Sequence, residues 1–174
     1  DNEFFYLDGE VKIKILDTGI NTATGGRIKR AEEYLDETFL MTYGDGLSNV
    51  NINKLVEFHD RHNKLATVTA VRPPARFGSL TIENDIVIDF GEKIQSKEGW
   101  INGGFFVLDK KVVDFIENDE MALEDYPLEN LSKTLNLQGF KHEGFWYPVD
   151  TIREKQTLEK FINENNGVLP WSND

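Results

Sequence analysis

The most constraining feature of this sequence is the segment from Phe39 to Gly46, where a short apolar run leads directly into Gly-Asp-Gly. The run favours a β-strand, and in an open α/β sheet ligands bind beyond the carboxyl ends of the strands. Gly44 and Gly46 let a ligand approach the backbone closely. Asp45 therefore suits Mg²⁺, which takes one or two carboxylates together with substrate phosphates. The alternative is an ordinary Asp-Gly turn after a buried strand.

Composition limits the classes of function that such a strand can serve. The 174 residues are 39% hydrophobic, which fits one domain with one core. The formal net charge of −12 argues against binding a nucleic acid polymer, although a local pocket of Arg, Lys and metal can still hold a small anion. The absence of cysteine excludes disulfides, thiolate zinc sites and cysteine nucleophiles. With no apolar run of about 18 residues and no visible signal peptide, we expect a soluble, cytoplasmic protein without membrane contact.

Strand-like and helix-like segments alternate along the chain. Strands are expected at 11–16, 39–43, 65–71, 80–82, 86–90 and 100–108, and helices at 27–35, 51–62, 110–116, 123–137 and 151–163. Thr151 and Glu154 form a capping box for the last helix. The repeated order predicts a single α/β domain over residues 1–174, with a mixed, mostly parallel sheet covered by helices.

A second candidate site is the loop Thr24-Gly25-Gly26, which precedes the basic residues Arg27, Lys29 and Arg30. A Thr-Gly-Gly loop that opens a helix can present backbone N–H groups to an anion, with support from the helix dipole. It is not a P-loop, because the GxxxxGK[ST] spacing is absent. The alternative is a plain loop followed by a solvated basic face.

Other polar residues carry weaker signals. Gly103-Gly104 interrupts an aromatic strand, which is typical either of a bulge or of a ligand that meets the backbone. Asp150 precedes the last helix, where it could bind a ligand or simply stabilise the helix N-terminus. His59 and His62 have i, i+3 spacing but no third metal ligand nearby, so we interpret them as ordinary helix-surface residues.

Seven motifs occur in one order along the chain, and together they resemble a known family. They are Leu16-Asp17-Thr18-Gly19, Thr24-Gly25-Gly26-Arg27, Thr42-Tyr43-Gly44-Asp45-Gly46, Arg76-Phe77-Gly78, Glu92-Lys93, Ile101-Asn102-Gly103-Gly104-Phe105-Phe106 and Phe145-Trp146-Tyr147-Pro148-Val149-Asp150-Thr151. This set resembles the glucose-1-phosphate cytidylyltransferases, a branch of the sugar-nucleotide pyrophosphorylases. The match spans nearly all of residues 11–171. It implies the Rossmann-like fold of the nucleotide-diphospho-sugar transferases, with a sugar-binding half at about 72–150 and a C-terminal helix at 151–165.

The resemblance implies a reaction and a set of roles. CTP and α-D-glucose 1-phosphate would give CDP-glucose and pyrophosphate, and the product would feed surface-sugar synthesis such as that of the lipopolysaccharide O-antigen. The implied catalytic residues are Asp45, Lys93 and Asp150, with Mg²⁺ held by Asp45 and Asp150. The implied nucleotide-binding residues are Thr24, Gly25, Gly26 and Arg27. The implied sugar-phosphate-binding residues are Gly78, Glu92, Lys93, Asn102 and Gly103.

The sequence departs from the family pattern in two places. Ile94 follows Glu92-Lys93 where the family usually has proline, and the Gly-rich Gly-x-Gly-Thr-Arg signature is not in this sequence. We therefore expect these residues to form the C-terminal two-thirds of such an enzyme, which tends to form homo-oligomers. The alternatives are a pyrophosphorylase that uses UTP or dTTP, a non-catalytic sugar-nucleotide-binding or regulatory module, and a structural subunit that completes its sheet with another chain.

Overall fold

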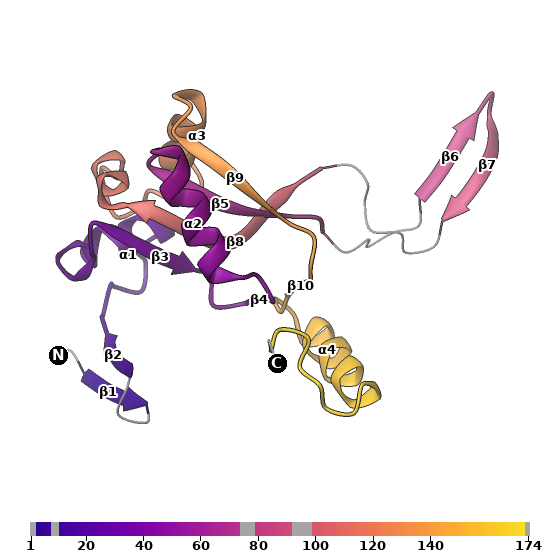
Figure 1. The fold of residues 1–174 in the computed structure, drawn as a ribbon, viewed down its shortest axis with the longest axis horizontal. Helices are drawn as coiled ribbons and strands as arrows, with labels where there is room; N and C mark the ends of the chain where they lie inside the picture. The colour runs from indigo at the N-terminus through magenta and orange to yellow at the C-terminus, as the bar shows by residue number, and fades with distance from the viewer. Residues whose placement is uncertain (1–2, 8–10, 74–78, 92–98, 173–174) are drawn as a thin grey trace. The chain divides into compact units, whose positions relative to one another are not determined.

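The computed structural model describes residues 3–7, 11–73, 79–91 and 99–172, whose strands and helices are shown in Figure 1. The strands are β1 Glu3–Leu7, β2 Val11–Ile15, β3 Thr38–Thr42, β4 Gly46–Ser48, β5 Ala66–Val71, β6 Ser79–Glu83, β7 Ile86–Gly91, β8 Ile101–Asp109, β9 Leu137–His142 and β10 Trp146–Pro148. The α-helices are α1 Thr24–Arg30, α2 Ile52–His62, α3 Tyr126–Lys133 and α4 Ile152–Glu164. Two 3₁₀ helices span Glu32–Tyr34 (η1) and Lys110–Phe115 (η2). The predicted α/β architecture is confirmed.

The chain divides into two compact units, each assembled from separate stretches of sequence. The first unit takes Asp1–Phe39, Lys64–Ala66 and Leu108–Leu137, and so holds the β1–β2 hairpin, α1, η1, η2 and α3. Its buried apolar residues come mainly from η2, α3 and the chain between them, and they are Val112, Val113, Ile116, Leu123, Leu128 and Leu131. Helix α1, which carries the predicted Thr-Gly-Gly-Arg motif, belongs to this unit.

The second unit takes Leu40–Asn63, Thr67–Val107 and Gln138–Asp174. Most residues of a four-stranded sheet belong to it, in the order β3-β8-β5-β9 (Figure 1). Strand β5, which was predicted, is largely buried, and from Thr67 on its buried residues alternate with half-buried ones. The core is formed by Leu55, Val71, Phe106 and Val107.

The proportion of parallel pairing differs from the expectation. The pairs β1–β2, β4–β10 and β6–β7 are all antiparallel. Antiparallel pairing is therefore more prominent than in the mostly parallel sheet that was predicted. One reason is that a short turn at Asn84 and Asp85 joins β6 to β7, and two strands joined by a short turn pair antiparallel.

The helix predicted at 123–137 is wrong at both ends. Helix α3 covers only Tyr126–Lys133. Leu135, which lies within the predicted range, has a φ of 59° and is 73% exposed. A left-handed residue ends an α-helix, and the chain continues from Leu137 into strand β9, which the sequence analysis missed.

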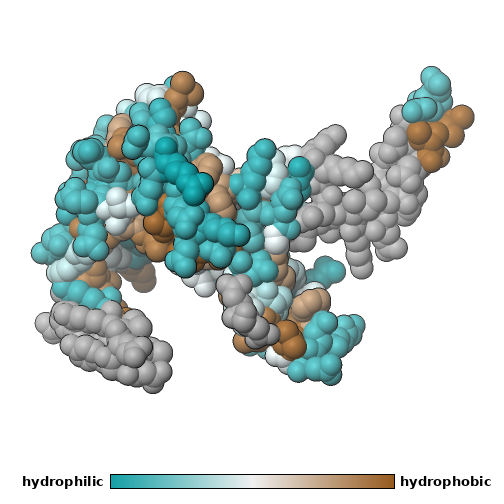
Figure 2. Space-filling model, viewed as in Figure 1, coloured by the Kyte–Doolittle hydropathy of each residue, from teal (hydrophilic) through white to brown (hydrophobic). Residues whose placement is uncertain are grey.

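In the sequence, strands β6 and β7 lie between the predicted site residue Gly78 and the predicted pair Glu92-Lys93. Ile86, Val87 and Ile88 are exposed near the turn between the two strands, where Figure 2 shows a hydrophobic patch. An isolated two-stranded hairpin has little core of its own.

Within the ranges that the structure describes, no helix has both the length and the apolar character needed to cross a membrane.

Candidate functional site

The two predicted metal ligands lie at the same end of one short strand pair in the second unit. Strands β4 and β10 are antiparallel, with Pro148 opposite Gly46. The ladder continues past this pair, because the Val149 N–H donates a hydrogen bond of 2.9 Å to the Asp45 carbonyl. Asp150 follows directly, so two residues that are 105 positions apart in sequence flank the same end of the ladder. Both side chains are exposed.

This pair of carboxylates fits Mg²⁺ better than a metal that needs a closed protein cage. Among the described residues, no group of three or more His, Cys, Asp or Glu side chains is arranged to hold a metal ion. Mg²⁺ usually keeps several waters and takes one or two carboxylates together with substrate phosphates. Asp45 and Asp150 would supply those two carboxylates, and a bound phosphate would complete the coordination.

The Asn-Gly-Gly segment of strand β8 is fixed by close packing. A Cβ on Gly103 would lie 2.8 Å from Val71 Cγ1 and 2.9 Å from the Thr69 carbonyl oxygen. Gly104 has a φ of +79°, and a Cβ there would lie 2.8 Å from Tyr43 Cδ2. Both positions are buried, so both glycines are required by the fold itself. Close packing therefore explains both glycines without any contribution from a ligand.

The side chain of Asn102 is already bound within this segment. Its Oδ1 accepts a hydrogen bond of 2.8 Å from the Gly104 N–H, and its Nδ2 donates one of 3.1 Å to the Tyr43 hydroxyl. An amide has two acceptor lone pairs and two donor hydrogens, so each end keeps capacity for a second partner. The exposed Asn102 side chain can therefore bind a hydroxyl while it stays in this position.

Two aromatic residues connect the Gly-Gly segment to the aspartates. The Tyr43 N–H donates a hydrogen bond of 3.0 Å to the Gly104 carbonyl, and Trp146 Nε1 donates one of 2.8 Å to the Gly103 carbonyl. Tyr43 lies two residues before Asp45, and Trp146 begins strand β10. The structure thus brings together, within one unit, the predicted metal ligands and the predicted sugar-binding residues of strand β8.

The Thr-Gly-Gly motif lies in the first unit. The expectation that these three residues form an open loop before the helix is wrong, because they belong to the helix. Helix α1 begins at Thr24 itself, and the Gly26 N–H donates to the Met121 carbonyl at 3.3 Å. A Cβ on Gly25 would lie 2.6 Å from that same carbonyl, and one on Gly26 would lie 2.6 Å from the Asp119 carbonyl. The glycines therefore admit the backbone of residues 119–123 close to the helix.

The Thr24 hydroxyl joins the same contact. It accepts a hydrogen bond of 2.9 Å from the Leu123 N–H and donates one of 2.6 Å to Glu124 Oε2. Thr24 remains exposed, as does Arg27, whereas Gly25 and Gly26 are buried. The two exposed side chains are the members of this motif that a nucleotide can reach directly.

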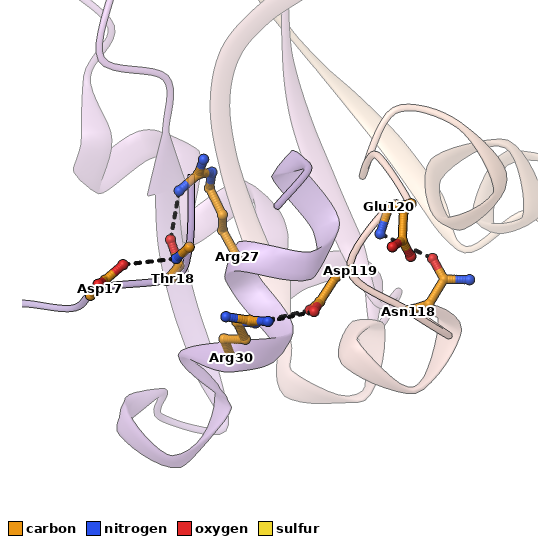
Figure 3. Close-up of polar contacts among 8 residues, drawn as sticks. Asp17, Thr18, Arg27, Arg30, Asn118, Asp119 and Glu120 are labelled. Carbon is orange, nitrogen blue, oxygen red and sulfur yellow. Dashed lines mark hydrogen bonds and ion pairs between the residues drawn. The ribbon is translucent and has the colours of Figure 1, made fainter. Parts of the chain in front are cut away.

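Figure 3 shows that the basic residues of helix α1 have different partners. Arg27 donates to the Thr18 hydroxyl at 2.7 Å. Arg30 forms a two-point contact with Asp119, with its Nε 3.0 Å from Oδ1 and its Nη2 2.5 Å from Oδ2. This hydrogen-bonded ion pair raises the pKa of Arg30 and lowers the pKa of Asp119. Lys29 donates to the Ile116 carbonyl, so Lys29 and Arg30, although exposed, also hold residues 116–119 beside the helix.

Sequence reasoning missed the role of the two helix α2 histidines. His59 is buried, at 7% exposure, and therefore is not the helix-surface residue that was expected. His59 Nδ1 and His62 Nε2 lie 2.9 Å and 2.7 Å from the hydroxyl oxygen of Thr67, which is fully buried. The i, i+3 spacing was visible, but its target on strand β5 was not, because Thr67 belongs to a different element.

Three of the predicted site residues, Gly78, Glu92 and Lys93, lie outside the described residues.

Comparisons with known proteins agree with these motifs. The family model described as "Nucleotidyl transferase" matches residues 8–159. A glucose-1-phosphate cytidylyltransferase from Salmonella typhi is 45% identical over 161 residues, which are 91% of this chain and 62% of that protein. A probable glucose-1-phosphate cytidylyltransferase from Bacillus subtilis is 44% identical over 90% of this chain and 62% of its own length.

A solved structure shares the fold. It is a putative glucose-1-phosphate thymidylyltransferase from Bacillus anthracis in complex with a sucrose, with a TM-score of 0.64 and 18% identity. The alignment covers 88% of this chain and 66% of that one. At this identity the likeness shows the fold alone. The chain thus spans somewhat less than two thirds of the length of the curated relatives that it matches.

Proposed function

Because the chain belongs to the nucleotidyl transferase family, we propose that the protein that carries it is a glucose-1-phosphate cytidylyltransferase. It would convert CTP and α-D-glucose 1-phosphate into CDP-glucose and pyrophosphate. The observation that carries the proposal is the hydrogen bond from Val149 to Asp45, which extends the β4–β10 ladder and brings Asp45 and Asp150 to one end of it. The similarity to cytidylyltransferases of the same sugar supports the choice of substrates.

The chemistry needs positioning and charge compensation rather than a covalent nucleophile. A phosphate oxygen of glucose 1-phosphate would attack the α-phosphorus of CTP in line and form a new P–O bond. The bond from the α-phosphorus to the bridging oxygen would break, and pyrophosphate would leave with the electron pair. Two polyanions must be held in line for this, and the protein reduces their mutual repulsion.

Each proposed residue has a part in this reaction. Asp45 and Asp150 would hold Mg²⁺, which supplies positive charge beside the nucleotide phosphates. Asn102 would bind a glucose hydroxyl through the donor and acceptor capacity that it keeps, and Gly103 would let the sugar lie against the backbone of strand β8. We also assign sugar hydroxyl binding to Glu92, sugar phosphate binding to Lys93, and close approach of the sugar to Gly78.

The nucleotide would contact the first turn of helix α1. Thr24 and Arg27 are the exposed side chains there, and we propose that they bind CTP directly. Gly25 and Gly26 are buried, so their contribution would come through the shape of the turn that they permit. Selection of cytosine over uracil or thymine would depend on this segment.

A pyrophosphate-release assay on the intact protein tests the proposal. We expect release with CTP, glucose 1-phosphate and Mg²⁺, and much less with UTP or dTTP in place of CTP. Asp45→Asn and Asp150→Asn should each lower the rate roughly 100- to 1000-fold, since each removes charge compensation at the transferring phosphoryl group. Asp60→Asn, which removes an exposed carboxylate from helix α2, is the matched control. Equal rates with all three nucleotides would refute the cytidylyl assignment, and equal rates in all three variants would refute the metal site.

A further inference from the structure

The first turn of helix α4 contains two hydrogen bonds more than a capping box requires. Thr151 is the N-cap: its hydroxyl accepts from the Glu154 N–H at 3.2 Å, and its own N–H donates to Glu154 Oε2 at 2.9 Å. These two bonds complete the box. The same Oε2 also accepts from the Asp150 N–H at 3.0 Å and from the Thr151 hydroxyl at 3.0 Å.

One of the two additional donors, the Asp150 N–H, belongs to a proposed metal ligand. The backbone around Asp150 is held on both sides, because the preceding N–H, that of Val149, donates to the Asp45 carbonyl at 2.9 Å. The direction of the Cα–Cβ bond of Asp150 follows from the backbone conformation between these two anchors. Glu154 is half-buried, whereas Asp150 is exposed, and Glu154 contacts Asp150 through its main-chain N–H.

We propose that Glu154 is a positioning residue for Asp150, and that its hydrogen bond to the Asp150 N–H sets the affinity of the Asp45–Asp150 pair for the divalent cation. The inference rests on the proposed function, since it assumes that this pair binds the metal. Residues that orient a metal ligand commonly change metal affinity when they are replaced, although they do not touch the ion. Glu154 acts here through a backbone group rather than through the ligand side chain.

Two other roles for Glu154 must be separated from this one. Glu154 could serve only to cap helix α4, in which case any damage to the cap would have the same effect. It could also act by its negative charge, in which case the neutral isostere would be as harmful as truncation. Three variants distinguish these roles: Glu154→Ala, Glu154→Gln and Thr151→Ala.

The experiment titrates the intact protein with Mn²⁺ in the presence of CTP and measures free Mn²⁺ by electron paramagnetic resonance. Thermal unfolding without metal, and pyrophosphate release as a function of Mg²⁺ concentration, are recorded for the same samples. We expect E154A to weaken Mn²⁺ binding roughly tenfold and to raise the Mg²⁺ requirement in parallel. E154Q keeps a side-chain oxygen acceptor and should recover most of that loss. T151A should lower the unfolding temperature and weaken Mn²⁺ binding much less than E154A, because it removes the hydroxyl that donates to Glu154 Oε2 but leaves the contact between the Asp150 N–H and that oxygen.

The contrary results are equally specific. Unchanged Mn²⁺ affinity in E154A overturns the inference, and so does the same loss in T151A, which would reduce Glu154 to a helix cap. E154Q as weak as E154A also overturns it, because the charge would then matter rather than the hydrogen bond to the backbone. If E154A does not fold, Glu154→Asp replaces it: the shorter carboxylate keeps the charge but withdraws the acceptor, so the same loss is expected. Failure of the unsubstituted protein both to bind Mn²⁺ and to release pyrophosphate would instead refute the proposed function.

Discussion

Replacement of Gly104 by alanine should be among the most damaging single-methyl changes in the second unit. Gly104 has a φ of +79°, and the added Cβ would lie 2.8 Å from Tyr43 Cδ2 and 3.3 Å from Tyr43 Cγ. A left-handed conformation costs a non-glycine residue about 1–2 kcal/mol, and overpacking of a tight site costs about 1–3 kcal/mol more. We therefore expect the free energy of unfolding to fall by about 2–5 kcal/mol. The Tyr43 ring cannot retreat freely, because it packs edge-on against Phe106 with ring centroids 5.8 Å apart.

The assay is urea unfolding followed by circular dichroism, with Gly139→Ala as the matched control. Gly139 is also in a strand of the same sheet, but a Cβ there would meet only Ala70 Cβ at 4.0 Å, which is ordinary contact. G139A should change the unfolding free energy by no more than about 0.5 kcal/mol. Similar midpoints for G104A and G139A would refute the reasoning from backbone conformation and close contact. A large loss in G139A would refute it as well, since nothing in its surroundings predicts one.

Two further predictions concern the first unit. Thr24→Ala should lower the free energy of unfolding by about 1–3 kcal/mol, because the N–H of the buried Leu123 loses its acceptor and Glu124 loses a donor. Thr24→Ser keeps the hydroxyl, so its free energy of unfolding in urea should stay close to that of the original protein. The second concerns Asp119, whose pKa is lowered from 3.8 by its hydrogen bond to Arg30. The ion pair is therefore fully stabilising above the pKa of the unfolded state and is lost as the pH falls through the lower pKa of the folded state. The difference in urea midpoint between the original protein and Asp119→Asn should be constant above about pH 5 and shrink below about pH 4; a constant difference down to pH 2 would contradict this.

Local signals in the sequence predicted most of the elements correctly. The helix predicted at 51–62 is confirmed, and Asn51 caps it by accepting a hydrogen bond from the Lys54 N–H. The capping box at Thr151 and Glu154 is present as expected. The turn at 83–85 joins β6 and β7, with positive φ values at Asn84 and Asp85. Each of these features is decided by a few neighbouring residues, so a single sequence is sufficient to find them.

Features that depend on distant partners were missed or misread. Strand β9 contains Gly139 and alternates weakly in hydrophobicity, so its identity as a strand comes from its neighbour β5 in the sheet. Gly25 and Gly26 were interpreted as an anion-binding loop, but the carbonyls that approach them belong to Asp119 and Met121. A glycine needed for close packing and a glycine needed for a ligand look the same in sequence. Only the partner distinguishes them.

The same reasoning explains why the aspartate pair could be predicted from the family resemblance but not from spacing. Asp45 and Asp150 come together because β4 pairs with β10, and each of these strands has only three residues. So short a ladder needs support from outside. Part of that support comes from the carbonyls of Gly103 and Gly104, which accept hydrogen bonds from residues next to each aspartate segment. The damage expected from Gly104→Ala should therefore extend to the Mg²⁺ affinity that we propose for Asp45 and Asp150, because the clash with Tyr43 displaces the chain two residues before Asp45.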